Sequence, residues 1–155
     1  MAHDPSSIRL EKSPLHMLHR VGQCAADAFQ AELGSADLTA RQFAVLVAVR
    51  QNEGVSQTGL VERTGIDRST LAEMIRLMLR KGLLRRRRRR EDARAYAVKL
   101  TEEGARVLKA AEPLTLRVDE RILMALPAKQ RERFVQDLNA IVVKLAKVEV
   151  RRVKP

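Results

Sequence analysis

Aromatic residues are scarce in this 155-residue sequence: tryptophan is absent, and the whole set is Tyr96, Phe29, Phe43 and Phe134. Proteins that bind single-stranded nucleic acids stack bases on aromatic rings, so this class is a poor match. Cysteine is almost absent as well. The single Cys24 excludes an internal disulfide framework.

The sequence also lacks the marks of a membrane protein, a secreted protein and an enzyme. No apolar run approaches the roughly 18 residues of a membrane-spanning helix, and residues 1–12 carry charges of both signs instead of a hydrophobic stretch. We therefore expect a cytoplasmic protein with no signal peptide and no membrane partner. Paired carboxylates, a glycine-rich phosphate loop and a nucleophile motif are missing, so we expect no catalytic residues, no cofactor and no enzyme.

The positive charge of the chain is concentrated in its middle third. Of the net charge of +11, residues 67–99 contribute most, with twelve Lys or Arg against four acidic residues, whereas residues 1–66 have six against seven. Six consecutive arginines, Arg85 to Arg90, lie in this segment. Guanidinium groups repel one another, so a folded domain keeps such a run mainly where a polyanion compensates it. The patch therefore favours a structured surface that binds the phosphates of double-stranded DNA.

Four helices are expected before the arginine run. Capping and stop residues predict a first helix over residues 13–34, a second over 39–54, a short third over 56–65 and a fourth over 67–82, which Asp67 caps. A short helix, a turn with glycine and a longer helix with polar residues at its start are typical of a helix-turn-helix. The second helix of this motif enters the major groove of DNA.

A β-hairpin is expected directly after the fourth helix. Residues 83–89 and 95–100 predict two strands around a turn. In the second strand Tyr96, Val98 and Leu100 alternate with smaller or charged residues, which predicts one buried and one exposed face. A hairpin that follows a recognition helix is a wing.

Two long helices are expected in the C-terminal third. The first begins at Thr101, and Pro113 is expected to kink or interrupt it because proline cannot donate a backbone hydrogen bond. Leu126-Pro127 predicts a break, and the last helix begins near Ala128. This helix carries an apolar seam suited to packing on another helix, for dimerisation. The seam consists of Phe134, Leu138, Ile141 and Leu145.

The order of these elements, and several segments within them, resemble the MarR family of winged helix-turn-helix transcriptional regulators. The segments are 38–46 (LTARQFAVL), 65–71 (GIDRSTL), 81–84 (KGLL), 92–94 (DAR) and 98–104 (VKLTEEG). The resemblance implies a mainly α (α+β) fold with a two-stranded β wing, an obligate homodimer on a pseudo-palindromic operator, and often a small-molecule pocket. It divides the chain into a flexible arm (1–12) and a single protomer (13–155) with a DNA-binding region (38–100) and dimerisation helices (13–34 and 101–150).

Candidate base-reading residues lie in the first half of the expected recognition helix. They are Arg68, Ser69, Thr70, Glu73 and Arg76. Arginine can pair bidentately with guanine and glutamate can accept from cytosine, each contributing about 1–3 kcal/mol of discrimination. The alternative is a solvated helix face. Leu77 and Leu79 occupy positions that are usually polar in the family, so the packing behind this helix is expected to differ.

The wing is far richer in arginine than the family pattern requires. Alternate residues of a strand point to opposite faces, so about half of the run should touch DNA. We assign Arg86, Arg88 and Arg90 and leave the other parity open. Arg94 resembles the family's wing-tip arginine, which enters the minor groove, and Asp92 is placed to support it. A bridge between Asp92 and Arg94 without a DNA contact is the alternative.

An anionic effector is suggested by cations outside the wing. Residues 15–20 (LHMLHR) are similar to those of family members that respond to aromatic acids or their CoA thioesters. The candidate effector residues are His16, His19, Arg20, Arg41 and Arg50. Ordinary packing is an equal alternative. Three histidines and one cysteine are a poor supply of ligands, so no metal is expected. Cys24, in mid-helix beside alanines, is expected to be a buried structural residue instead of a peroxide sensor.

The sequence thus predicts a sequence-specific, homodimeric repressor that a small anionic ligand releases from DNA. A non-specific nucleoid-like or RNA-binding protein that uses the arginine run is the alternative class. The ordered recognition helix argues against this alternative.

Overall fold

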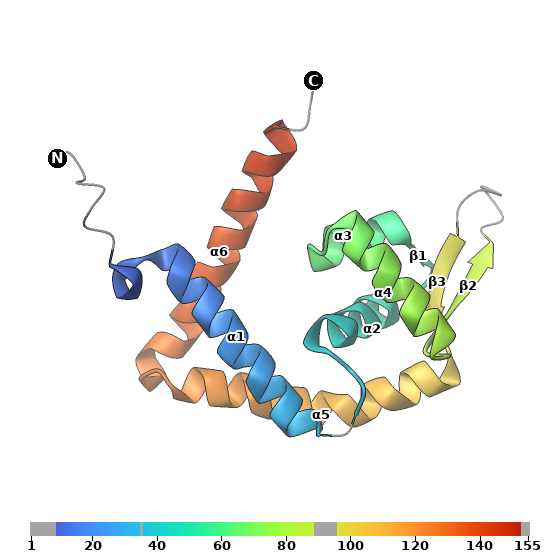
Figure 1. Cartoon of the computed structure of the whole chain (residues 1–155), viewed down its shortest axis with the longest axis horizontal. Coiled ribbons are helices and arrows are strands. Elements are labelled where there is room, and N and C mark those ends of the chain that lie inside the picture. The colour runs from blue at the N-terminus through green and yellow to red at the C-terminus, as the bar shows by residue number, and fades with distance from the viewer. Residues whose placement is uncertain (1–8, 35, 89–95, 153–155) are drawn as a thin grey trace. The chain divides into compact units, whose positions relative to one another are not determined.

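The computed structural model describes residues 9–34, 36–88 and 96–152. These residues form six α-helices and three strands, together with the turns that connect them (Figure 1). Backbone contacts divide the chain into two units, Met1–Val118 and Asp119–Pro155. This architecture confirms the predicted mainly α fold with a small β wing.

The first helix begins and ends where the sequence predicts. After a 3-10 turn over Leu10–Lys12, α1 spans Pro14–Leu33. The hydroxyl of Ser13 caps it by accepting from the backbone N–H of His16 at 3.3 Å. Gly34 ends it with φ of 58°, a conformation that residues with a Cβ rarely adopt. Only Phe29 and Leu33 of α1 are buried, whereas its apolar residues Leu15, Leu18 and Val21 are exposed in the single chain.

Three further helices form the helix-turn-helix region: α2 (Ala40–Gln51), α3 (Gln57–Thr64) and α4 (Arg68–Arg80). The predicted capping box at α2 is confirmed. Thr39 N–H donates to Gln42 Oε1 at 3.0 Å, and Gln42 N–H donates to Thr39 Oγ1 at 3.2 Å. Helix α3 contacts both α2 and α4. The side chains at the centre of this region are fully buried: Leu46, Leu60, Leu71, Ile75 and Met78.

The sheet has one strand more than predicted. Strands β2 (Leu84–Arg88) and β3 (Tyr96–Leu100) form the expected antiparallel hairpin, and β1 (Val55–Ser56) pairs with the outer side of β3, giving the order β1-β3-β2. The predicted alternation in β3 is wrong in part. Ala97 is only 7% exposed, because β3 is the central strand of the sheet. Tyr96 is 43% exposed, because it is the first residue of β3 and lies at the end of the hairpin.

Helix α5 (Glu102–Met124) runs through Pro113 without a break, so the predicted interruption is wrong. Proline removes one backbone donor and crowds the carbonyl four residues earlier, at Lys109. The helix nevertheless buries Leu108 and Ala111 before the proline and Val118 after it. The burial of these apolar residues, before and after Pro113, compensates for the lost hydrogen bond.

The second unit holds the end of α5 and all of α6 (Ala128–Arg152). The predicted break at Leu126-Pro127 is confirmed, because α5 ends at Met124 and α6 begins at Ala128. Within the predicted seam of α6, Phe134 and Leu138 are half-buried, whereas Ile141 and Leu145 are 42% and 60% exposed. None of the described helices is long and apolar enough to cross a membrane.

Candidate nucleic-acid interface

Helix α4 has a buried side and an exposed polar side. Leu71, Ile75 and Met78 hold the buried side in the core. Arg68, Ser69, Glu73 and Arg76 are exposed, whereas Thr70 is half-buried. Four of the five predicted base-reading residues therefore share the accessible surface of one rigid helix.

Three of these exposed residues are already engaged with neighbours. The Ser69 hydroxyl donates to Asp67 Oδ1 at 3.0 Å, and the Arg76 guanidinium forms an ion pair with the Glu73 carboxylate one turn away. Both partners of the ion pair are more than half exposed. Such an exposed pair is weak and exchanges readily for other partners.

The start of α4 is fixed by the predicted cap, Asp67. Its Oδ1 accepts from the backbone N–H of Thr70 at 2.9 Å. Hydrogen bonds from Thr70, and then from the Ser69 hydroxyl, favour the charged carboxylate and lower the pKa of Asp67 to about 2. The cap is therefore ionised at neutral pH.

The described part of the wing presents four exposed arginines, Arg85 to Arg88. In the antiparallel pairing, Arg86 lies opposite Val98 and Arg88 opposite Tyr96, whereas Arg85 lies opposite Lys99. The Arg86 guanidinium lies over the Tyr96 ring, 6.0 Å from its centroid. This cation–π contact was not anticipated from the sequence, because it depends on strand register. The predicted contacts Arg90 and Arg94, and Asp92 beside them, lie outside the described residues.

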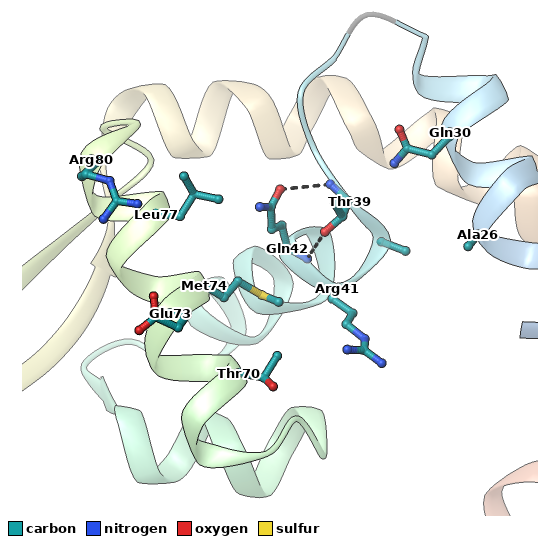
Figure 2. Close-up of a pocket in the computed structure, with 11 residues that line it drawn as sticks. Ala26, Gln30, Thr39, Arg41, Gln42, Thr70, Glu73, Met74, Leu77 and Arg80 are labelled. Carbon is teal, nitrogen blue, oxygen red and sulfur yellow. Dashed lines mark hydrogen bonds between the residues drawn. The ribbon is translucent and has the colours of Figure 1, made fainter. Parts of the chain in front are cut away.

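An open groove of about 720 Å³ lies along one flank of α4, beside its buried side (Figure 2). Met74 and Leu77 of α4 point into it, Arg41 of α2 extends along it, and Ala26 and Gln30 of α1 lie on its other side. Leu77, which departs from the family pattern, therefore forms part of an apolar wall. Thr70, Glu73 and Arg80 also line the groove.

The five predicted effector residues do not come together. Arg41 lines the groove, but Arg50 forms an ion pair with Glu112 of α5, which raises the pKa of Arg50. His16, His19 and Arg20 lie in the first half of α1, and none of them lines the groove. The Arg50–Glu112 pair could not be predicted from the sequence, because its members lie far apart in the chain.

Cys24 is exposed, so the prediction of a buried structural cysteine is wrong. It lies about 180° around α1 from Leu33 and about 140° from Phe29, the two residues by which α1 packs on the core. The small alanines beside it suggested burial but do not reveal which side of the helix faces inward. Among the described residues, no group of three His, Cys, Asp or Glu is arranged to hold a metal ion.

Helix α4 is held in the core by its buried side and exposes polar residues on the other, and a cationic hairpin follows it. This combination defines a winged helix-turn-helix DNA-binding protein. Residues 36–95 match the family model described as MarR family. The transcriptional regulator HosA of Escherichia coli O157:H7 is 39% identical over 127 residues, covering 82% of this chain and 93% of HosA. The chain therefore belongs to the MarR family. The family and the relatives that match this chain are transcriptional regulators and not enzymes.

Solved structures agree with this assignment. The PcaV transcriptional regulator of Streptomyces coelicolor, in complex with its natural ligand, superposes with a TM-score of 0.82 at 32% identity, covering 94% of this chain and 99% of PcaV. The transcriptional repressor CouR, bound to a 23-mer DNA duplex, gives a TM-score of 0.80 at 25% identity, covering 91% of this chain and 99% of CouR.

Acidification is expected to weaken the start of α4. The pKa of Asp67 is lower in the folded protein than its ordinary value of 3.8, so the unfolded chain binds the proton first. The stabilisation by this carboxylate is therefore complete above the ordinary pKa and is lost as the pH falls towards 2. The difference in free energy of unfolding between the wild type and Asp67→Ala should shrink from about pH 4 to about pH 2, as measured by urea denaturation. Asp67→Asn, which keeps a cap acceptor without a charge, is the control. A difference that stays constant over this range would contradict the assignment.

Proposed function

We propose that this protein is a sequence-specific, homodimeric repressor that binds a pseudo-palindromic operator and is released by a small anionic ligand. The observation that carries DNA recognition is the two-sided α4, with three apolar residues buried and four polar candidates exposed. A recognition helix needs this combination, because base contacts require a rigid support.

Base reading is assigned to α4 and backbone binding to the wing. Arg68 and Arg76 are the residues best suited to guanine, because a guanidinium can donate two parallel hydrogen bonds to O6 and N7. Arg76 would exchange its weak pair with Glu73 for this contact. The wing arginines meet phosphates, which fix position and carry no sequence information. Arg86, Arg88, Arg90 and Arg94, supported by Asp92, remain the proposed wing contacts.

Dimerisation is supported by apolar surface that the single chain leaves uncovered. In α6, Ile141 and Leu145 are exposed, and Phe134 and Leu138 are only half-buried. In α1, Leu15 is 68% exposed. Burial of such patches against a second copy is the usual way in which a small protein removes them from water. A two-fold dimer in turn calls for a pseudo-palindromic operator.

The effector is best accommodated by the groove beside α4. Its volume of about 720 Å³ suits a small organic ligand. Arg41 and Arg80 supply positive charge, and Ala26, Met74 and Leu77 supply apolar contacts, a combination that fits an aromatic acid. CouR has been crystallised with p-coumaroyl-CoA, which joins an aromatic group to an anionic carrier. His19 lies on the same side of α1 as Ala26, so the α1 candidates could contact a longer ligand of this kind.

A non-specific nucleoid-like or RNA-binding protein is the second candidate, because four exposed arginines in β2 would bind any polyanion. Competition decides between the two candidates. An excess of random-sequence duplex or of double-stranded RNA should leave a specific complex largely intact, whereas it would dissolve a non-specific one.

Base reading can be tested by comparing a substitution in α4 with a substitution in the wing. The probe is the duplex that binds most tightly after selection from random DNA. Arg76→Ala should relax base preference at defined positions at a cost of about 1–3 kcal/mol, whereas Arg88→Gln should weaken binding to selected and random duplexes alike. Both are measured by fluorescence anisotropy. Equal losses on both duplexes for Arg76→Ala would remove the recognition-helix assignment.

Effector release can be tested at the groove with benzoate and p-coumaroyl-CoA as probes. Arg41→Ala should leave DNA affinity nearly unchanged but raise at least tenfold the probe concentration that releases DNA, because it removes a charge-assisted contact of about 1.5–3 kcal/mol. Arg50→Ala is the matched control, since its guanidinium pairs with Glu112 outside the groove. Arg20→Ala tests the α1 candidates. An unchanged response in Arg41→Ala would discard the groove as the effector site.

A further inference from the structure

A second hollow lies at the C-terminal end of α4. Its volume of about 370 Å³ lies within the range of about 300–1,000 Å³ that is usual for small-molecule sites. Its walls come from three stretches that are distant in the sequence: the end of α1 with the loop after it (33 and 36–38), the connection from α4 to β2 (81 and 83) and the first part of α5 (106–114). These stretches belong to the unit Met1–Val118, and none of the described residues lines both this hollow and the groove beside α4.

The floor of the hollow is apolar and fixed in the core. Leu33, Leu38 and Leu83 are each at most 6% exposed, and Val107 and Leu114 of α5 are half-buried. Apart from three charged residues, every described residue that lines the hollow is a leucine, a valine or an alanine. This floor therefore suits an apolar group, and its side chains offer no hydrogen bond to a polar one.

The three charged lining residues are two cations, Lys81 and Arg106, and one acid, Asp37. Arg106 is paired with Glu103 on its own helix, with Nε 2.8 Å from Oε2, but its side chain is 69% exposed and such a pair exchanges readily. The side chain of Lys81 is only 24% exposed. Water screens a partly buried charge less, so Lys81 is the stronger partner for an anion.

The ammonium of Lys81 is held in place and has a donor to spare. It donates to Oδ2 of Asp37 at 2.5 Å and to the Asp37 carbonyl oxygen at 3.1 Å. An ammonium has three donors, and among the described residues only Asp37 accepts from this one. The backbone beneath it is fixed, because Gly82 has φ of 70° and Leu83 N–H donates to the Met78 carbonyl at 2.9 Å, which closes the end of α4.

The acid in the hollow is easily replaced. The Asp37 side chain is 88% exposed, so water can take over its hydrogen bonds when it leaves Lys81. A second carboxylate that arrives with an apolar group would keep the charge pairing and would also cover the leucines of the floor.

We propose that the hollow binds a small monocarboxylate with an apolar body, such as a short fatty acid, as a second ligand of this protein. Its carboxylate accepts from Lys81 in place of the Asp37 carboxylate, and its chain lies on Leu38 and Leu83. The ligand thus exchanges the tie between α4 and the loop after α1 for a tie to itself. It acts at the end of α4, about 20 Å along the helix from Arg68, and leaves the base-reading surface open. Binding here depends neither on DNA recognition nor on the effector groove.

The experiment is a titration of the full-length protein with hexanoate, followed by NMR of ¹³C-labelled leucine methyl groups. The methyl signals of Leu38 and Leu83 should shift together and saturate, on a curve separate from that of Leu77 in the groove. Lys81→Gln should weaken hexanoate binding about tenfold or more, because a hydrogen bond between two charged groups is lost. Asp37→Asn should strengthen it about two- to fivefold, because a competing exposed ion pair is removed. Hexanamide, which has no charge, should bind the wild type at least tenfold more weakly.

The matched control is Lys99→Gln. The Lys99 side chain is 22% exposed and its Nζ lies 2.9 Å from Oε1 of Glu53, a pair like that of Lys81 but outside the hollow. This variant should bind hexanoate like the wild type. Ala110→Phe, at an exposed position that lines the hollow, should block binding with Lys81 in place.

Equal affinities of hexanoate for the wild type and Lys81→Gln would overturn the proposal. Equal affinities of hexanoate and hexanamide would do the same without any variant, so the test does not depend on the folding of Lys81→Gln. Leu38 and Leu83 signals that shift with protein concentration before hexanoate is added would assign the hollow to a second copy of the chain instead. No DNA is present, so a failure here is distinct from a failure of the proposed function.

Discussion

Replacement of Gly104 by alanine is expected to lower the free energy of unfolding by about 3 kcal/mol, at the upper end of the cost of overpacking. A Cβ at this position would lie 2.0 Å from the carbonyl oxygen of Leu83 and 2.9 Å from its carbonyl carbon. Both are backbone atoms, so no side-chain rotation relieves the clash. Leu83 joins α4 to β2, and the displacement should also disturb the recognition helix and the wing.

The local hydrogen bonds explain why this approach is so close. The Thr101 hydroxyl donates to the Gly82 carbonyl at 2.5 Å and accepts from Gly104 N–H at 2.9 Å, while Thr101 N–H donates to the Leu83 carbonyl at 3.2 Å. Urea denaturation at one fixed protein concentration measures the effect. Gly22→Ala is the control, since nothing lies within 4 Å of its Cβ and alanine should stabilise this helix by about 0.5–1 kcal/mol. Equal free energies of unfolding for Gly104→Ala and the wild type would show that the backbone at Leu83 moves away from α5 at little cost.

Charged substitution in the α6 seam is expected to produce monomers and to reduce the affinity for the selected duplex more than about 100-fold. Leu138→Asp and Ile141→Asp place carboxylates in a surface that we propose to be buried between protomers, where an unpaired charge costs several kcal/mol. A monomer then binds one half-site without the benefit of the linked second half. Sedimentation measures the mass, and anisotropy measures the DNA affinity.

The control lies on the opposite side of the same helix. Gln136→Asp introduces the same charge at an exposed position about 180° from the centre of the seam, so it should change neither mass nor affinity appreciably. A monomeric mass for the unmodified protein at micromolar concentration would contradict the proposed dimer.

Local chemistry made most of the helices predictable. The Ser13, Thr39, Ser56 and Asp67 caps lie where the sequence predicts them, because each side chain bonds to a backbone N–H only three residues away. The spacing of Leu71, Met74, Ile75 and Met78 likewise predicts one apolar side of α4, and all of them except Met74, which is half-buried and lines the groove, are buried. The core of the DNA-binding region follows from these short-range rules.

The errors arose where long-range contacts decide the outcome. Strand β1 has only two residues, too few to produce an alternating pattern, and it exists because β3 offers a free edge. The continuity of α5 through Pro113 depends on burial along the helix, and the pairing of Arg50 with Glu112 depends on how α2 meets α5. The groove beside α4 also joins three helices, so only Arg41 among the effector candidates was placed in it.

The position of Tyr96 gives the protein an intrinsic optical reporter. The chain has no tryptophan and no other tyrosine, so its near-ultraviolet emission comes from this one ring in β3. The ring is 43% exposed and lies under the Arg86 guanidinium, which makes its emission sensitive to the surroundings of the wing. Engagement of the wing by DNA can therefore be followed in the unlabelled wild-type protein, separately from events at α4 or in the groove.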